Sequence, residues 1–159
     1  MLSNILKPFH VDNENLIRIG PKFDGGYVID KRIIKLVKII ITCGLNDDWN
    51  FEKNFLKLNP DCSIIAYDHT INNNFWIKRF KKDAINFLKL KKIMPKQIID
   101  IFKYFDYRFF FRKKNKHLLL KVGKNSINKN EISINSILQN LDHVLIKVDI
   151  EGDEYQTLA

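Results

Sequence analysis

Residues 38–44, Lys-Ile-Ile-Ile-Thr-Cys-Gly, decide the fold class. The segment is rich in β-branched residues and almost continuously apolar, which is typical of a strand buried on both faces of a parallel sheet. Residues 63–67, 117–122 and 144–148 have the same character. The sequence therefore predicts four buried strands in one sheet, the first of which ends at Gly44.

Helical segments separate these strands. Apolar residues recur at helical spacing in residues 50–58 and 75–92, Pro95 can open a helix that runs toward Phe109, and Ser133 can cap a helix that ends at Asp142-His143. This alternation favours right-handed βαβ crossovers. We expect an α/β fold, a Rossmann-like open and mostly parallel sheet with helices on both faces.

The composition is that of a globular chain. Of 159 residues, 45% are hydrophobic and 28% are charged, which excludes global disorder. The longest apolar stretch, residues 39–45, is far shorter than the roughly 20 residues of a membrane-spanning helix, and the N-terminus has no signal-peptide core. We expect a cytoplasmic chain in one domain, residues 1–159, with residues 1–35 as a lead-in segment and residues 36–159 as the core.

The cysteines and the charges exclude further classes. Cys43 and Cys62 form no Cys-x-x-Cys pair, so neither a disulfide scaffold nor a zinc knuckle is predicted. The net charge of +9 comes from residues 70–130, which hold 17 basic and 3 acidic side chains. Lysine outnumbers arginine in the chain by 22 to 5, which disfavours a nucleic-acid partner. A solvated helix face and an anionic partner such as an acidic glycan remain open.

Polar residues follow the first, second and fourth predicted strands. Gly44 follows the first, Asp68-His69 the second, and Asp149 and Glu151 the fourth. Ligands of open α/β sheets bind outside the carboxyl ends of the strands, where the strand order reverses. Each position also has a structural interpretation: a turn at the glycine, a loop residue after the second strand, and acids that complement a helix dipole after the fourth.

Three stretches together resemble the FkbM-type family of class I S-adenosylmethionine-dependent methyltransferases. They are residues 18–28, which contain Asp-Gly-Gly-Tyr-Val, residues 43–52, which contain a glycine turn and a Phe-Glu helix start, and residues 145–155, which contain Lys-x-Asp-x-Glu-Gly-x-Glu. The third stretch is the most specific. Their order and spacing also agree with the family, so the resemblance covers most of the chain.

The resemblance implies S-adenosylmethionine as the cofactor and O-methylation of a sugar, a glycan or another small hydroxyl compound. The catalytic residues that it implies are Asp149 and Glu151. The cofactor contacts that it implies are Gly44, Asn46, Asp47, Glu52, Asp68, His69 and Asp149. The residues that it implies for the substrate pocket are Asp24, Gly25, Gly26 and Tyr27, although Asp-Gly is also a strong hairpin-turn signal.

Elementary chemistry agrees with this assignment. Gly44 permits a tight turn through which backbone N–H groups can approach the methionine carboxylate of the cofactor. A carboxylate at Asp68 can accept both ribose hydroxyl protons. An acid at Asp149 could hold the cofactor's amino group, orient a substrate hydroxyl or act as a general base.

The chain departs from the family at its C-terminal end. Members of the family continue with another helix, a fifth strand and an antiparallel final pair, whereas this sequence ends at Ala159. We expect either a fragment or a truncated relative, with a homo-oligomer as one way to cover the open sheet edge. The alternative function is a noncatalytic Rossmann-like module that binds an anionic partner, either nucleic acid or an acidic glycan.

Overall fold

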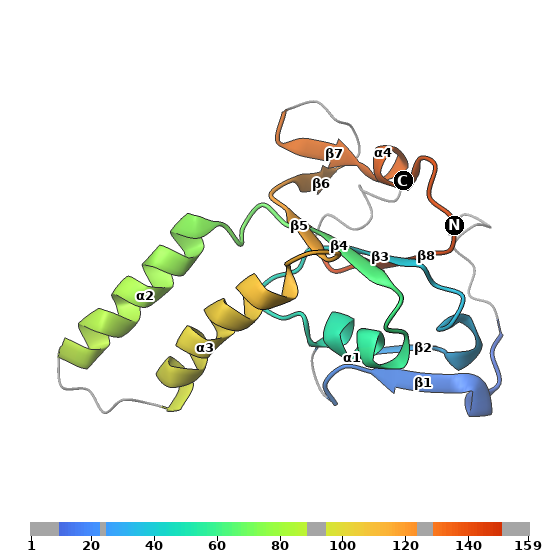
Figure 1. The fold of residues 1–159 in the computed structure, drawn as a ribbon, viewed down its shortest axis with the longest axis horizontal. Helices are drawn as coiled ribbons and strands as arrows, with labels where there is room; N and C mark the ends of the chain where they lie inside the picture. Colours follow the sequence, from blue (N-terminus) through green and yellow to red (C-terminus); the bar gives the residue numbers. More distant parts are fainter. Residues whose placement is uncertain (1–9, 23–24, 89–94, 124–128, 151–159) are drawn as a thin grey trace.

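The computed structural model describes residues 10–22, 25–88, 95–123 and 129–150. Its centre is a four-stranded parallel sheet in the order β5-β4-β3-β8 (Figure 1). The strands are β3 (Ile39–Cys43), β4 (Ser63–Tyr67), β5 (Lys116–Leu118) and β8 (Val144–Val148). The predicted α/β fold with a parallel sheet is confirmed.

The register places the ends of the three longest strands together. Cys43 at the end of β3 pairs with Tyr67 of β4 on one side and with Val148 of β8 on the other. The chain runs from β3 outward to β4 and β5 and then returns to place β8 on the opposite side of β3. The strand order therefore reverses between β3 and β8, and the residues after these strands gather at one edge.

The described residues form four α-helices, two of which lie against the sheet and two of which form a hairpin beside it. They are α1 (Asn50–Leu58), α2 (Asn73–Leu88), α3 (Pro95–Phe110) and α4 (Ile134–Leu138). The pleat sends Ile40 to one face, where it packs with Phe55 of α1, and Ile41 to the other, where it packs with Ile137 of α4. Figure 1 accordingly shows α1 and α4 on opposite sides of the sheet.

A β-hairpin that the sequence did not predict as strands covers α1. It consists of β1 (Leu16–Ile19) and β2 (Tyr27–Asp30), which pair antiparallel. The hairpin follows a short 3-10 turn, η2 (Asn13–Asn15), and leads into another, η3 (Lys31–Ile33). The ring of Tyr27 meets the ring of Phe51 edge-on, with centroids 5.2 Å apart. The hairpin interpretation of the glycine pair is thus correct, because Gly25 and Gly26 lie in the connection between the two strands.

The predicted third strand, residues 117–122, is wrong as a single strand. β5 ends at Leu118, and β6 (Lys121–Gly123) pairs instead with β7 (Glu131–Ser133) in a separate two-stranded sheet. A tight turn divides the two segments, because the N–H of Leu120 donates to the carbonyl of Leu118 at 2.8 Å. The helix that Ser133 caps is also shorter than predicted and ends at Leu138.

Helices α2 and α3 form a hairpin that extends away from the sheet (Figure 1). Aromatic contacts hold the two helices together: Trp76 and Phe80 of α2 both meet Tyr104 of α3, with ring centroids 5.3 and 5.4 Å apart. None of the helices in the described ranges is long and apolar enough to cross a membrane.

Candidate functional site

A cavity of about 440 Å³ lies at the carboxyl edge of the sheet, at the reversal of strand order. Three strand ends and the start of β6 supply its walls. The lining residues are Gly44, Asn46, Tyr67, Asp68, His69, Thr70, Leu120, Lys121, Val122, Asp149 and Ile150. The volume falls in the usual range of small-molecule sites, roughly 300 to 1,000 Å³.

Gly44 allows β3 and β8 to meet at this edge. Its φ is +80°, and a Cβ atom placed on it would lie 2.1 Å from the backbone oxygen of Asp149. The N–H of Asp149 donates to the carbonyl of Cys43 at 2.8 Å and holds the two strand ends together. Both the backbone conformation and this close approach therefore require glycine.

Asp68, at the end of β4, ties two loops together. Its Oδ2 accepts hydrogen bonds from the N–H groups of Leu45 and Asn46, at 2.9 and 2.8 Å. Its Oδ1 accepts from the N–H and the hydroxyl of Thr70, at 2.7 and 2.6 Å. A carboxylate has about four acceptor positions, and here the protein itself occupies four.

Hydrogen bonding also sets the protonation of Asp68. Burial raises the pKa of this carboxyl, but the donors of Thr70 and the backbone N–H groups of Asn46 and Leu45 outweigh burial, so the pKa lies below its ordinary value of 3.8. Asp68 is therefore a charged brace between the loops that follow β3 and β4. The acceptor positions of Asp68 thus already have partners within the chain, and the ribose contact of Asp68 stays a prediction.

The backbone donors of the glycine turn are occupied as well. The N–H of Gly44 donates to the carbonyl of Tyr67 at 3.0 Å, and the next two N–H groups donate to Asp68. These three N–H groups thus have partners within the chain, and their approach to a cofactor carboxylate stays a prediction. Asn46 keeps its place in the cavity wall, where its side-chain Oδ1 accepts from the N–H of Asp47 at 2.9 Å.

Asp149, at the end of β8, is the acid that remains accessible. Its side chain is exposed and lines the cavity, and its Oδ2 accepts a hydrogen bond from the hydroxyl of Tyr27 at 2.9 Å. This contact joins two of the three stretches that carry the family resemblance, 122 residues apart in the chain. The structure thus brings together the predicted catalytic residue Asp149 and the predicted pocket residue Tyr27.

A buried ion pair lies next to the contact between Tyr27 and Asp149. Lys147 Nζ lies 3.3 Å from Glu52 Oε1, which also accepts from the hydroxyl of Thr42 at 2.7 Å. The same ammonium lies 5.2 Å from the ring centroid of Tyr27 and 5.7 Å from that of Phe51. A cation near the face of an aromatic ring is attracted to it. The pair therefore fixes β8, α1 and the hairpin to one another.

Two predicted cofactor residues lie elsewhere. Glu52 is completely buried in this ion pair and does not line the cavity, so the prediction that it touches the cofactor is not supported. Asp47 is also absent from the lining, because its Oδ2 binds Arg79 at 2.5 Å and Lys103 at 3.2 Å. Asp47 instead anchors the α2–α3 hairpin to the loop after β3.

His117 supports the site without lining it. Its Nε2 lies 2.9 Å from the carbonyl of Asp68, and its Nδ1 contacts the hydroxyl of Tyr107. A carbonyl can only accept, so Nε2 carries the proton and the tyrosine hydroxyl donates to Nδ1. Burial lowers the pKa of His117 below 6.5. The imidazole is thus neutral and holds the end of β4 in place. His69, by contrast, lines the cavity.

Four residues predicted for the site do not take part in the contacts described above. Gly25 and Gly26 do not line the cavity, and Asp24 and Glu151 lie outside the described residues. Six lining residues are not among those that the sequence predicts: Tyr67, Thr70, Leu120, Lys121, Val122 and Ile150. Tyr67 and Thr70 flank a predicted residue and could have been found from that proximity. Lys121 and Val122 of β6 could not, since residues 117–122 are predicted to belong to the third strand of the central sheet.

Comparisons with known proteins add no assignment: no family, no curated protein and no solved structure matches the chain. Within the described ranges, no group of three or more histidine, cysteine, aspartate or glutamate side chains could hold a metal ion.

Proposed function

We propose that this chain binds S-adenosylmethionine in the cavity at the sheet edge and transfers its methyl group to a hydroxyl of a small molecule or glycan. The observation that carries the proposal is the position of the cavity. It lies between the ends of β3, β4 and β8, where the order of a parallel sheet reverses and where such folds bind nucleotide-containing ligands. The resemblance of the surrounding stretches to methyltransferases names the ligand.

The lining fits part of this cofactor. Asp149 can accept from an ammonium group, and the side-chain amide of Asn46 can donate to a carboxylate. Leu120, Val122 and Ile150 offer apolar surface to an adenine ring. Asp68 fits only as a brace, because its acceptor positions are filled. The proposal therefore moves the main polar contact from the end of β4 to the end of β8.

Methyl transfer to a hydroxyl would require few groups from the protein. The cofactor supplies an electrophilic methyl group when it is bound. Transfer to oxygen then requires a hydroxyl held in line and one acceptor for its proton. Asp149 suits the second task, since its Oδ2 is oriented by the hydroxyl of Tyr27 and the carboxylate is exposed to the cavity.

Calorimetric titration with S-adenosylmethionine tests the proposal. We expect saturable binding by the wild-type chain and about tenfold weaker binding by Asp149→Asn, which removes a charged hydrogen-bond acceptor. Asp142→Asn is the matched control, because it makes the same change at an exposed position just before β8, at the strand's other end. A folded wild-type chain that does not bind the cofactor would contradict the proposal and favour the noncatalytic alternative.

A further inference from the structure

Helix α3 carries an exposed ridge of three phenylalanines. Phe102, Phe105 and Phe109 are 67%, 63% and 78% exposed. At about 100° per residue they share one narrow side of the helix. Together the rings leave roughly 400 Å² of apolar surface in water, which matches the largest apolar patch on a typical soluble monomer, about 300 to 600 Å², and such patches are often functional. We call these three residues the phenylalanine ridge.

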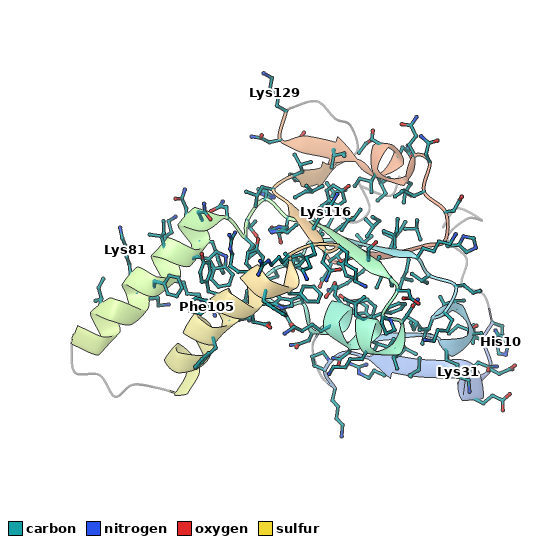
Figure 2. All side chains as sticks on the ribbon, in the orientation of Figure 1. His10, Lys31, Lys81, Phe105, Lys116 and Lys129 are labelled. Carbon is teal, nitrogen blue, oxygen red and sulfur yellow. The ribbon has the colours of Figure 1, made fainter. Side chains whose placement is uncertain are left out.

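The ridge lies on the outer side of the α2–α3 hairpin. Tyr104 and Tyr107 occupy the opposite side of α3, where they contact Trp76 of α2. Figure 1 shows that the hairpin extends away from the sheet, and Figure 2 places Phe105 on it. The ridge is therefore separate from the cavity and can meet a flat surface without obstruction from the sheet.

Cations accompany the ridge. Arg108 is exposed and lies between Phe105 and Phe109 in the chain, and Arg112 and Lys113 are exposed just beyond the end of α3. Asp106 is the single acid among the α3 residues whose side chains are described. Its carboxylate is neutralised by Lys53, at 2.5 Å, and also accepts from Trp49. The ridge is thus an apolar strip with a positive border.

We propose that this face of α3 docks on an anionic membrane surface, with the phenylalanine ridge at the acyl boundary and the arginines on lipid phosphates. Apolar side chains bordered by Lys and Arg are the composition of helices that lie in the membrane interface. A second copy of the chain fits less well. The ridge offers about half of the roughly 800 Å² that each partner of a stable dimer buries, and two positive borders would repel each other.

Single-stranded nucleic acid also fits less well. It binds in grooves where cations and aromatic rings alternate along the backbone path. Here the three rings share one side of α3, and the cations lie beside and beyond them. An anionic membrane surface offers an apolar layer for the phenylalanine ridge and phosphate groups for the arginines.

Vesicle co-sedimentation of the full chain tests this proposal. We expect binding to vesicles of phosphatidylcholine with phosphatidylserine, little binding to phosphatidylcholine alone, and weakening by added salt. The double variant Phe105→Ser, Phe109→Ser should lose about tenfold or more in affinity. Arg108→Gln with Arg112→Gln should lose about fivefold for each cation removed.

Two control variants remove similar side chains at positions away from the phenylalanine ridge. Leu36→Ser removes an apolar side chain of similar exposure, 60%. Leu36 follows η3 and lies outside the α2–α3 hairpin. Lys81→Gln with Lys82→Gln removes two cations from the outer side of α2, and Figure 2 shows Lys81 pointing away from α3. Leu36→Ser should bind vesicles like the wild type, and the lysine variant should lose less than the arginine variant.

The proposal is independent of methyl transfer, so its outcome can be read whether or not the cofactor binds. Equal binding to both kinds of vesicle, or undiminished binding by the ridge variant, would overturn it. So would a dimer in sedimentation equilibrium that the ridge variant abolishes, or binding to oligothymidylate that depends on the ridge.

Discussion

The ends of β4 and β8 offer two aspartates in equivalent positions with opposite surroundings. Each follows a strand that flanks β3, and each lies at the edge of the same cavity. Asp68 is buried and accepts four hydrogen bonds from its own loops, whereas Asp149 is exposed and, among the residues that the structure describes, accepts one, from Tyr27. A strand-end acid thus becomes a structural brace or a ligand-binding group according to how many donors the chain itself supplies.

The largest expected effect is at the junction between the two regions. Gly44→Ala places a Cβ atom 2.1 Å from the backbone oxygen of Asp149 at a φ of +80°. We expect the free energy of unfolding to fall by about 3 kcal/mol, because β3 and β8 must separate or the turn must change conformation. Urea denaturation measures this change. A loss below about 1 kcal/mol would show that the strand ends are not tightly joined.

The second prediction compares the two acids directly. Asp68→Asn should lower the free energy of unfolding by about 2 to 3 kcal/mol, because an amide cannot accept from all four donors and leaves buried N–H groups unpaired. Asp149→Asn should cost about 0.5 kcal/mol or less, since the side chain is exposed. Equal losses in urea denaturation would abolish the distinction between brace and binding group.

The third prediction uses pH. Burial lowers the pKa of His117, which bonds the carbonyl of Asp68, below 6.5. The unfolded chain therefore takes up a proton before the folded chain does. The contribution of His117 to stability should level off above pH 6.5 and should make stability fall as the pH drops from 6.5 toward the lowered pKa. His117→Gln retains a donor for the carbonyl and should flatten this slope; an unchanged slope would assign it to another group.

The smallest expected effect is at the hydroxyl that orients Asp149. Tyr27→Phe removes one exposed hydrogen bond but retains the ring that packs on Phe51 and Lys147. The free energy of unfolding should fall by about 0.5 kcal/mol. In an Asp149→Asn background the further loss should be smaller still, which a double-mutant cycle would measure. A large loss in both backgrounds would mean that the hydroxyl has another structural task.

The sequence predicts the central sheet well and its periphery poorly. Continuous apolar runs identify β3, β4 and β8 because strands buried on both faces have no polar alternation. The same rule fails at residues 117–122, where apolar character continues from β5 into β6 although the chain changes sheets at Leu119 and Leu120. Apolarity reports burial, and it does not report which sheet a residue joins.

The candidate site shows a similar limit. The rule for strand ends correctly places Gly44, Asp68 and Asp149 around one cavity. It cannot tell the two acids apart, because the donors that saturate Asp68 come from loop conformation. The motif that contains Glu52 predicts a contact with the cofactor. In the structure Glu52 is buried and pairs with Lys147, which lies 95 residues away in the chain.

The most direct test of the central claim locates the ligand on the chain. Ultraviolet cross-linking of radiolabelled S-adenosylmethionine, followed by peptide mapping, should place the label on peptides that contain the cavity wall: Gly44 to Asn46, Tyr67 to Thr70, Leu120 to Val122 or Asp149 to Ile150. Excess unlabelled cofactor should remove it. Label on peptides remote from the cavity, or none on a folded chain, would contradict the account.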